Sequence, residues 1–304
     1  MIIICKSNSN AGLINMDNIQ INKLFNKYRS KIKHIGSQHP VMNQIKHIQN
    51  NTSDDSERLL VAEGMWAHQK LLKTELNIRC FLVCPELIYS NEGLELVEDF
   101  TNKAEETIIV PKKLFEKLSD RDGPDGFASI VRIPNFDIKK LVLKDNALVL
   151  ILDSLENPGN IGTILRTCDG AGVIAVFICK KKARLTNPKL LKSSMGALFT
   201  IPIIEFVDTN ECIKWVKGHD FNIYLADTRA DKSYKDYNYN GNTVLVIGSE
   251  RYGISEEWYT CNPQLISIPM LGICDSLNAG VAASILTYEI SMKINERRSG
   301  KVIL

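Results

Sequence analysis

Three short stretches in the second half of the chain combine side chains that can bind an anion with small residues that expose backbone. Asn160 and Arg166 belong to the first stretch, Glu250 to the second, and Ser276 and Asn278 to the third. A guanidinium binds carboxylates and phosphates, and amides and hydroxyls orient polar ligands through hydrogen bonds. Each stretch follows an apolar run that is typical of a buried strand. Because parallel strands end at one edge of a sheet, the three stretches are predicted to form one composite site.

Each candidate side chain also has a structural interpretation. Asn160 stands before an apolar-periodic stretch and is a natural N-cap, and Ser276 and Asn278 could cap the last long helix. Glu250 ends an apolar strand, where its carboxylate could cap the following turn or hold Arg166.

The charge of Arg166 requires a partner, because its apolar neighbours predict a partly buried stem. An internal ion pair with Glu250 or Asp169 would satisfy this requirement, and so would a bound phosphate. The spacing of the residues leaves both interpretations open.

The elements that must position these residues alternate between strands and helices. Apolar strands separated by helices predict an α/β fold with a mostly parallel sheet that is covered on both faces. The predicted strands span residues 148–153, 174–180, 202–206, 221–226, 243–248 and 265–269. The predicted helices span residues 160–172, 187–198, 209–218 and 276–296.

Changes in pattern divide the chain into four segments. Residues 1–38 are predicted to be an N-terminal extension with a basic amphipathic helix over residues 22–33. Residues 39–134 alternate helices and strands and predict a small α/β sandwich. A linker over residues 135–146 then leads to the larger domain, residues 147–304.

The bulk composition narrows the classes of function. The chain has 304 residues and a formal net charge of +2, so any nucleic-acid surface has to be a local basic patch. Lys180 to Arg184 form one candidate run, with Lys189 and Lys192 after it. The eight cysteines have no CxxC spacing and no histidine pair completes a zinc pattern, which favours a reducing, cytoplasmic protein without a metal. No apolar run reaches membrane-spanning length.

The three stretches together resemble the signature motifs of the SpoU/TrmH family of RNA 2′-O-ribose methyltransferases, part of the SPOUT superfamily. The matching segments are NIGTILRT at residues 160–167, IGSERYG at 247–253, IPM at 268–270 and DSLN at 275–278. Residues 41–133 resemble, more weakly, the accessory RNA-binding domain of this family. The cues there are Glu63-Gly64 before a helix and a closing strand over residues 126–131.

The resemblance implies a deep trefoil knot in the larger domain, a homodimer, and S-adenosylmethionine bound in the knot. It assigns cofactor contacts to residues of the second and third motifs, where small and apolar residues suit an adenine and a methionine moiety. These residues are Gly248, Ile268 and Leu277, with their neighbours Ile247, Ser249, Pro269 and Met270.

The implied reaction transfers a methyl group to a ribose 2′-hydroxyl and needs no metal. Arg166 is expected to pair with a phosphate of the target nucleotide and to stabilise the developing alkoxide, while phosphate or water takes the proton. Asn160 would orient the nucleotide or Arg166, and Glu250 would hold the geometry of the site. Ser276 and Asn278 would position the substrate and their own loop.

The separate N-terminal domain favours ribosomal RNA over transfer RNA as the partner. Four alternatives remain open: a transfer-RNA methyltransferase, a resistance enzyme that modifies ribosomal RNA, a methyltransferase acting on a base, and a catalytically inactive RNA-binding protein.

Overall fold

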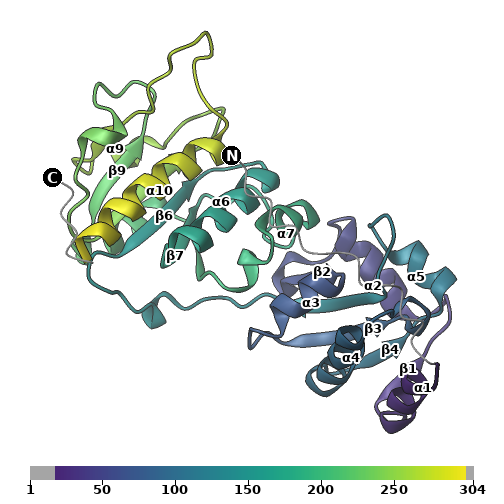
Figure 1. The fold of residues 1–304 in the computed structure, drawn as a ribbon. Coiled ribbons are helices and arrows are strands. Elements are labelled where there is room, and N and C mark those ends of the chain that lie inside the picture. Colours follow the sequence, from purple (N-terminus) through teal and green to yellow (C-terminus); the bar gives the residue numbers. More distant parts are fainter. Residues whose placement is uncertain (1–17, 299–304) are drawn as a thin grey trace. The chain divides into compact units, whose positions relative to one another are not determined.

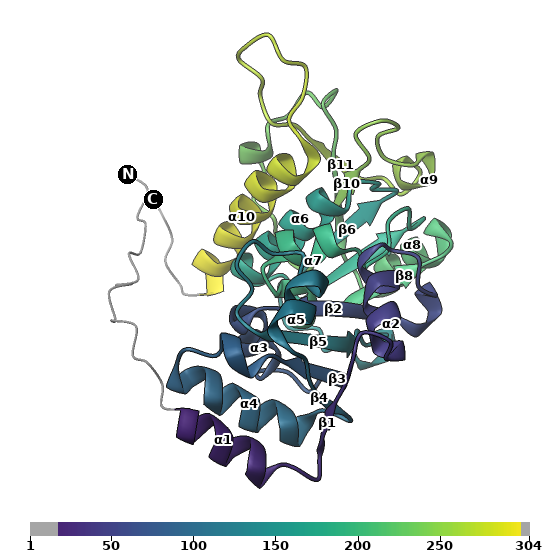
Figure 2. The same ribbon diagram turned by 90° about the vertical axis from the view of Figure 1, so that its right-hand side faces the viewer.

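The computed structural model describes residues 18–298, which form two compact units. Figures 1 and 2 show the ribbon from two directions, coloured along the chain. The boundary between the units lies between Ile133 and Pro134. Each unit contains one sheet of its own.

The N-terminal unit is built on a mixed five-stranded sheet. Its strands are β1 (Ile32–His34), β2 (Leu59–Glu63), β3 (Ile78–Val83), β4 (Thr107–Ile109) and β5 (Phe127–Arg132). In the sheet they follow the order β1-β4-β3-β5-β2. β4 runs parallel to both of its neighbours, whereas β5 runs antiparallel to β3 and to β2.

Helices cover both faces of this sheet. They are α1 (Asn18–Lys27), α2 (Pro40–Gln49), α3 (Met65–Leu71), α4 (Asn91–Lys103) and α5 (Lys112–Leu118). Side chains of β3 alternate between the two layers, as in any strand. Cys80 and Leu82 lie in the core that α2 and α5 complete, and Phe81 contacts His68 of α3 and Phe100 of α4. This arrangement confirms the predicted small α/β sandwich.

The segment that begins at residue 18 joins this unit, and the helix predicted over residues 22–33 is wrong in its bounds. α1 ends at Lys27, and residues 32–34 pair with β4 as an edge strand. Tyr28, which follows α1, donates a hydrogen bond to Glu98 of α4 at 2.8 Å and accepts one from Asn102 at 3.1 Å. A three-residue strand is too short for its own periodicity to reveal it. Residues 1–17 of the predicted extension lie outside the described residues.

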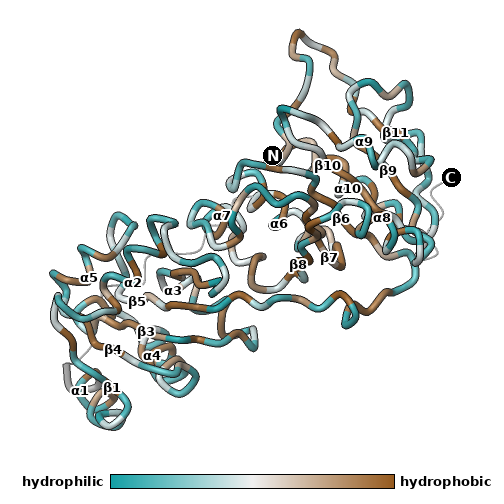
Figure 3. Tube along the Cα trace, turned by 180° about the vertical axis from the view of Figure 1, so that it is seen from behind, coloured by the Kyte–Doolittle hydropathy of each residue, from teal (hydrophilic) through white to brown (hydrophobic). Residues whose placement is uncertain are grey.

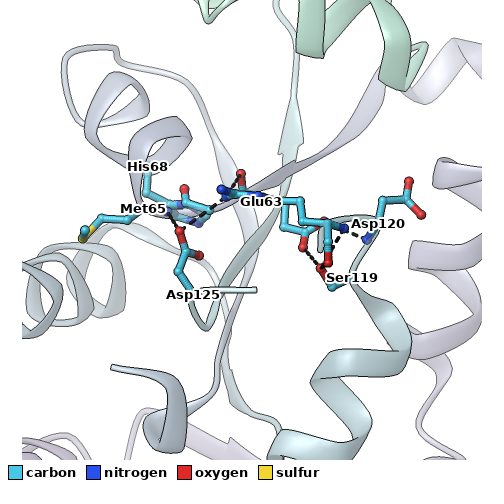
Figure 4. Close-up of polar contacts among 8 residues, drawn as sticks. Glu63, Met65, His68, Ser119, Asp120 and Asp125 are labelled. Carbon is cyan, nitrogen blue, oxygen red and sulfur yellow. Dashed lines mark hydrogen bonds and ion pairs between the residues drawn. The ribbon is translucent and has the colours of Figure 1, made fainter. Parts of the chain in front are cut away.

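A polar cluster ties the end of β2 to the loop that follows α5 (Figure 4). The Glu63 carboxylate accepts hydrogen bonds from the Ser119 hydroxyl and from the backbone N–H of Asp120, at 3.2 Å for the latter. Asp125 accepts from the backbone N–H of Met65 at 2.8 Å. Burial raises the pKa of Glu63 above its ordinary value. The Glu63-Gly64 pair noted in the sequence therefore lies where hydrogen bonds join the end of β2 to the loop after α5.

His68 is fully buried beside this cluster and predicts a pH-dependent stability. Its Nδ1 lies 2.8 Å from the carbonyl oxygen of Gly64, which can only accept, so Nδ1 donates and Nε2 accepts from Ser129 at 2.9 Å. Burial lowers the pKa of His68 from 6.5 to about 4. The unfolded chain therefore binds a proton that the folded unit does not, between these two values. Stability is fully present above pH 6.5 and falls toward pH 4, by on the order of 3 kcal/mol.

Urea unfolding between pH 4 and 7.5 measures this dependence. The variant His68→Asn should flatten the slope of unfolding free energy against pH, whereas the exposed control His47→Asn should keep the wild-type slope. Parallel slopes for wild type and His68→Asn would show that His68 is not the titrating group.

The C-terminal unit is built on a six-stranded sheet in which every pairing is parallel. Its strands are β6 (Leu148–Asp153), β7 (Ala175–Cys179), β8 (Ile203–Phe206), β9 (Asn222–Ala226), β10 (Thr243–Gly248) and β11 (Gln264–Ile266). They follow the order β11-β9-β10-β6-β7-β8. The chain moves outward from β6 through β7 to β8 and then continues on the other side of β6. The loops after β6 and β10 therefore diverge and leave a crevice at the carboxyl edge.

Two layers of helices cover this sheet, which confirms the predicted parallel α/β fold. The helices are α6 (Pro158–Ala171), α7 (Pro188–Ser194), α8 (Thr209–Gly218), α9 (Glu256–Tyr259) and α10 (Ala279–Arg298). Side chains of α8 and α9 share a core with one face of the strands. α6 and α10 lie on the other face (Figure 1), and β6, β7 and β10 are largely hydrophobic (Figure 3).

The predicted linker, residues 135–146, belongs to the C-terminal unit by its packing. Four apolar side chains from the predicted linker pack against the core of the C-terminal unit: Phe136, Ile138, Leu141 and Leu143. The knot depends on how the chain threads its loops and not on strand order, and it stays a prediction.

Between residues 18 and 298 no helix is both long enough and apolar enough to cross a membrane.

Candidate functional site

Asn160 lies in the first turn of α6 and is not its N-cap, contrary to the prediction. The N-cap is Asn157, whose side chain accepts a hydrogen bond from the backbone N–H of Gly159 at 2.9 Å. Pro158 occupies the first helical position, where its missing N–H costs nothing. The pair Asn157-Pro158 is the sequence signal that indicates where α6 begins. Because Asn157 caps the helix, the side chain of Asn160 is left for other contacts.

Asn160 joins the three predicted motifs through one chain of hydrogen bonds. Its Nδ2 donates to the Glu250 carboxylate, and its Oδ1 accepts from Nδ2 of Asn278 at 3.2 Å. The Oδ1 of Asn278 accepts from the backbone N–H of Gly280 at 2.9 Å. The Gly280 N–H can only donate, so it fixes the orientation of the Asn278 amide and, through it, that of Asn160. Each residue in this series therefore donates to the next, and the Glu250 carboxylate is the last acceptor.

The last helix begins later than predicted, and this changes the role of two residues. α10 starts at Ala279, so Asn278 caps its first turn as predicted, through its bond to Gly280. Ser276 precedes the helix and lies on an exposed loop, so its predicted capping role is wrong. This loop, residues 267–278, projects from the unit in both Figure 1 and Figure 2.

Arg166 is exposed, so the prediction of a partly buried stem is wrong, and of the two open interpretations the internal ion pair with Glu250 or Asp169 does not occur. Its neighbours Ile164 and Leu165 are buried, so the apolar face of α6 turns away from Arg166. Asp169 instead accepts a hydrogen bond from the hydroxyl of Thr200 at 3.1 Å. Among the residues that the structure describes, the Arg166 guanidinium makes no hydrogen bond or ion pair. It is therefore available to an anion from outside the protein.

A cavity of about 450 Å³ opens at the carboxyl edge beside these residues. Glu250 and Ser276 both line it. Six of the seven residues predicted to contact a cofactor line it as well: Ile247, Gly248, Ser249, Ile268, Met270 and Leu277. Pro269 is exposed on the loop and lies outside the cavity wall.

Gly248 is placed against backbone at one wall of this cavity. A Cβ at this position would lie 2.3 Å from the carbonyl carbon of Gly253 and 2.5 Å from the backbone nitrogen of Ile254. The turn is closed by two backbone hydrogen bonds between Ser249 and Gly253, of 3.0 and 2.9 Å. Only glycine permits this approach.

Sequence reasoning missed three residues at the polar end of the cavity: Asp227, Arg229 and Tyr259. The Asp227 carboxylate accepts from Nε and Nη2 of Arg229 at 3.1 and 2.8 Å and from the Tyr259 hydroxyl at 2.7 Å. The Arg229 hydrogen bond, with that of Tyr259, lowers the pKa of Asp227 to about 2. Asp227 directly follows β9, so the carboxyl-edge argument applied to the three motifs would have found it.

The basic run of residues 180–184 is less available than its sequence indicates. Lys180 pairs with Glu257 at 2.8 Å, and Lys181 pairs with Glu205 at 2.8 Å. Lys182 is exposed, and so are Lys189 and Lys192, which both lie on α7.

α7 packs closely on α6 at Gly162, where a Cβ would lie 2.5 Å from the carbonyl oxygen of Leu190. No group of three or more His, Cys, Asp or Glu side chains within residues 18–298 could hold a metal ion.

Comparison with known proteins finds a family match for each of the two units. The SpoU rRNA Methylase family matches residues 147–288, and the MRM3-like substrate binding domain matches residues 40–129. A 23S rRNA (uridine(2479)-2′-O)-methyltransferase of Streptomyces viridochromogenes is 30% identical over 206 residues, which cover 66% of this chain and 71% of that protein.

Solved structures share the fold. The SpoU methyltransferase AviRb from Streptomyces viridochromogenes, in complex with the cofactor AdoMet, superposes with a TM-score of 0.75 at 25% identity, covering 86% of this chain and 99% of that one. An AdoMet-bound rRNA methyltransferase from Sinorhizobium meliloti has a TM-score of 0.77 at 22% identity over 88% of this chain and 98% of that one. The chain belongs to the SpoU/TrmH family of RNA methyltransferases.

Proposed function

We propose that this chain transfers a methyl group from S-adenosylmethionine to a ribose 2′-hydroxyl of RNA. The observation that carries the proposal is the hydrogen-bonded set of Asn160, Glu250 and Asn278, which joins three sequence motifs beside one cavity. Arg166 lies six residues from Asn160 on the same helix with a free guanidinium. The similar methyltransferases of Streptomyces viridochromogenes support both the reaction and the cofactor.

The residues that line the cavity suit the cofactor in polarity and in charge. Ile247 and Leu277 supply apolar surface for an adenine ring, and the bare backbone at Gly248 permits close recognition. Glu250 and Glu256 also line the cavity and leave it negatively charged, since Asp227 is paired with Arg229, and this charge suits a sulfonium cation. When bound, S-adenosylmethionine supplies the electrophilic methyl group.

The residues of the site would then act by positioning and by electrostatics. Arg166 binds a phosphate of the target nucleotide and stabilises the alkoxide that develops on the 2′-oxygen. A guanidinium stays protonated at neutral pH, so phosphate or water accepts the proton. Asn160 and Asn278 hold the Glu250 carboxylate in a single orientation. Ser276 positions the substrate from the loop that forms part of the cavity wall.

The RNA substrate is proposed to be ribosomal RNA. Residues 39–134 would bring it to the catalytic domain, residues 147–304, and the match to a substrate binding domain over residues 40–129 supports this division. The exposed side chains of Lys182, Lys189 and Lys192 would contact phosphates together with Arg166.

A homodimer in the cytoplasm is the proposed working state. Val281, Tyr288 and Met292 are exposed on one face of α10, as expected of an interface between copies. The seven cysteines within the described residues are all free thiols, which suits a reducing compartment. Light scattering should give twice the chain mass of 34.2 kDa, and a monomer mass at micromolar concentration would contradict the dimer.

Methyl mapping tests the proposed function directly. Purified protein is incubated with radiolabelled S-adenosylmethionine and with either unmodified ribosomal RNA or unmodified transfer RNA, and the RNA is digested to nucleosides. We expect the label in a 2′-O-methyl nucleoside from ribosomal RNA. A label on a base would contradict ribose methylation, and a label in transfer RNA alone would contradict the proposed substrate.

A further inference from the structure

An arginine at the wall of the cavity is held in a fixed geometry by a buried carboxylate. The Asp227 side chain is 6% exposed, and the Arg229 side chain is 77% exposed. Nε and Nη2 of Arg229 hold the two oxygens of Asp227, and the backbone N–H of Arg229 also donates to Asp227, at 2.9 Å. Such a two-point contact fixes the plane of the guanidinium as well as its position.

Tyr259 completes the anchor from a different element. Its hydroxyl donates to Asp227 at 2.7 Å and accepts from Nη2 of Arg229 at 3.2 Å. Tyr259 ends α9, which follows the second motif, whereas Asp227 follows β9. The three side chains therefore join two segments that both line the cavity.

One nitrogen of the guanidinium is left over by these contacts. Among the described residues, Nη1 of Arg229 has no hydrogen-bond partner, although Nε and Nη2 are both engaged. Nη1 carries two donors, so an oxygen in the cavity could accept from a group whose orientation is already fixed. Prior ordering lowers the entropic cost of binding.

The rest of the cavity wall indicates which ligand would supply this oxygen. The backbone N–H of Asp227 donates to the carbonyl of Ile266 at 3.0 Å, which places the turn after β9 beside the third motif. The cavity that Arg229 lines is the one lined by Gly248, Ile268 and Leu277. A ligand that fills it would bring its own oxygens within reach of the turn after β9.

We propose that Arg229 is a cofactor-binding residue that donates to an oxygen of S-adenosylmethionine, either its carboxylate or its ribose hydroxyls, and that Asp227 and Tyr259 are the positioning residues that hold it. The inference rests on the proposed function, since it concerns the same cavity. It adds a residue outside the three motifs to the recognition of the cofactor.

Calorimetry with two cofactor fragments tests the inference without any turnover. S-adenosylhomocysteine retains the adenine, the ribose and the amino acid, and methylthioadenosine retains the adenine and the ribose but lacks the amino acid. We expect Arg229→Gln to weaken S-adenosylhomocysteine at least tenfold, and Arg229→Lys to recover part of that loss through its charge. Loss for S-adenosylhomocysteine alone assigns the carboxylate, and equal loss for both fragments assigns the ribose.

Two further variants separate binding from structure. Tyr259→Phe removes one bond to Asp227 and should weaken S-adenosylhomocysteine by a smaller factor, with a melting temperature close to wild type. Arg132→Gln is the matched control, because Arg132 is exposed, lies outside the three motifs and does not line the cavity. Its affinity should equal that of the wild type.

The outcomes also separate this inference from the proposed function. Unchanged affinity of folded Arg229→Gln for both fragments would overturn the inference, and so would a loss seen only in the KM for RNA. Failure of the wild type to bind S-adenosylhomocysteine would overturn the proposed function and the inference together.

Discussion

Replacing Arg166 with alanine is expected to lower the methylation rate by about 10²–10³-fold, the usual effect of removing one donor that stabilises developing negative charge. The guanidinium has no partner among the described residues, so its loss leaves no buried charge unpaired. The fold and the affinity for S-adenosylmethionine should therefore remain close to wild type. Single-turnover rates with saturating cofactor, together with calorimetry, measure the two effects separately.

The lysine variant sharpens this prediction. Arg166→Lys keeps the charge but loses the planar fork that binds phosphate through two bonds, so it should recover only part of the rate. Lys214→Ala removes an exposed cation on α8, outside the three motifs, and should retain full activity. Turnover of Arg166→Ala within a few-fold of wild type would remove Arg166 from the mechanism.

Replacing Gly248 with alanine is expected to damage both the cavity and the C-terminal unit. The added Cβ would meet backbone atoms of Gly253 at 2.3 and 2.4 Å, and backbone cannot move aside as the end of a flexible side chain can. Relief requires the turn over residues 249–253 to shift, and that turn carries Glu250. We expect S-adenosylhomocysteine affinity to fall at least tenfold and unfolding free energy to drop by about 1–3 kcal/mol, as in overpacked sites.

Gly218→Ala is the matched control for this substitution. Gly218 ends α8, and a Cβ there would meet no atom within 4 Å. Its cofactor affinity should equal that of the wild type, and its unfolding free energy should be unchanged or higher, by up to about 1 kcal/mol, because alanine restricts the unfolded chain. Calorimetry and urea unfolding of the two alanine variants provide the comparison, and equal values for both would refute the steric argument at Gly248.

The local pattern of apolar and polar residues was sufficient to predict those helices and strands whose own residues carry a clear periodicity. Thr209–Gly218 and Thr243–Gly248 were predicted with the bounds that the structure has. The long apolar strands predicted a parallel sheet because both of their faces are buried. Element ends were less secure: the Asn160 and Ser276 predictions placed helix starts two and three residues from those observed, since several polar residues competed for the cap.

Contacts between distant residues were not accessible to the same reasoning. Periodicity indicated that Arg166 belongs to a helix with apolar neighbours, but the direction of its side chain depends on which face α10 and the sheet cover. Lys180 and Lys181 read as a free basic run because Glu257 and Glu205 reach them only after folding. Arg229 was missed because Tyr259, which holds it together with Asp227, comes from a separate segment.

The sequence by itself determined the parallel α/β architecture, the motif residues and the family that they resemble, because each depends on residue types at short spacing. Only the tertiary structure decided that Asn160 bonds to Glu250 and Asn278, that Arg166 is free, and that Asp227 and Arg229 share the cavity. The physical reason is the order of the strands. β10 lies between β9 and β6, so segments far apart in the chain end at one edge, and no local pattern encodes that order.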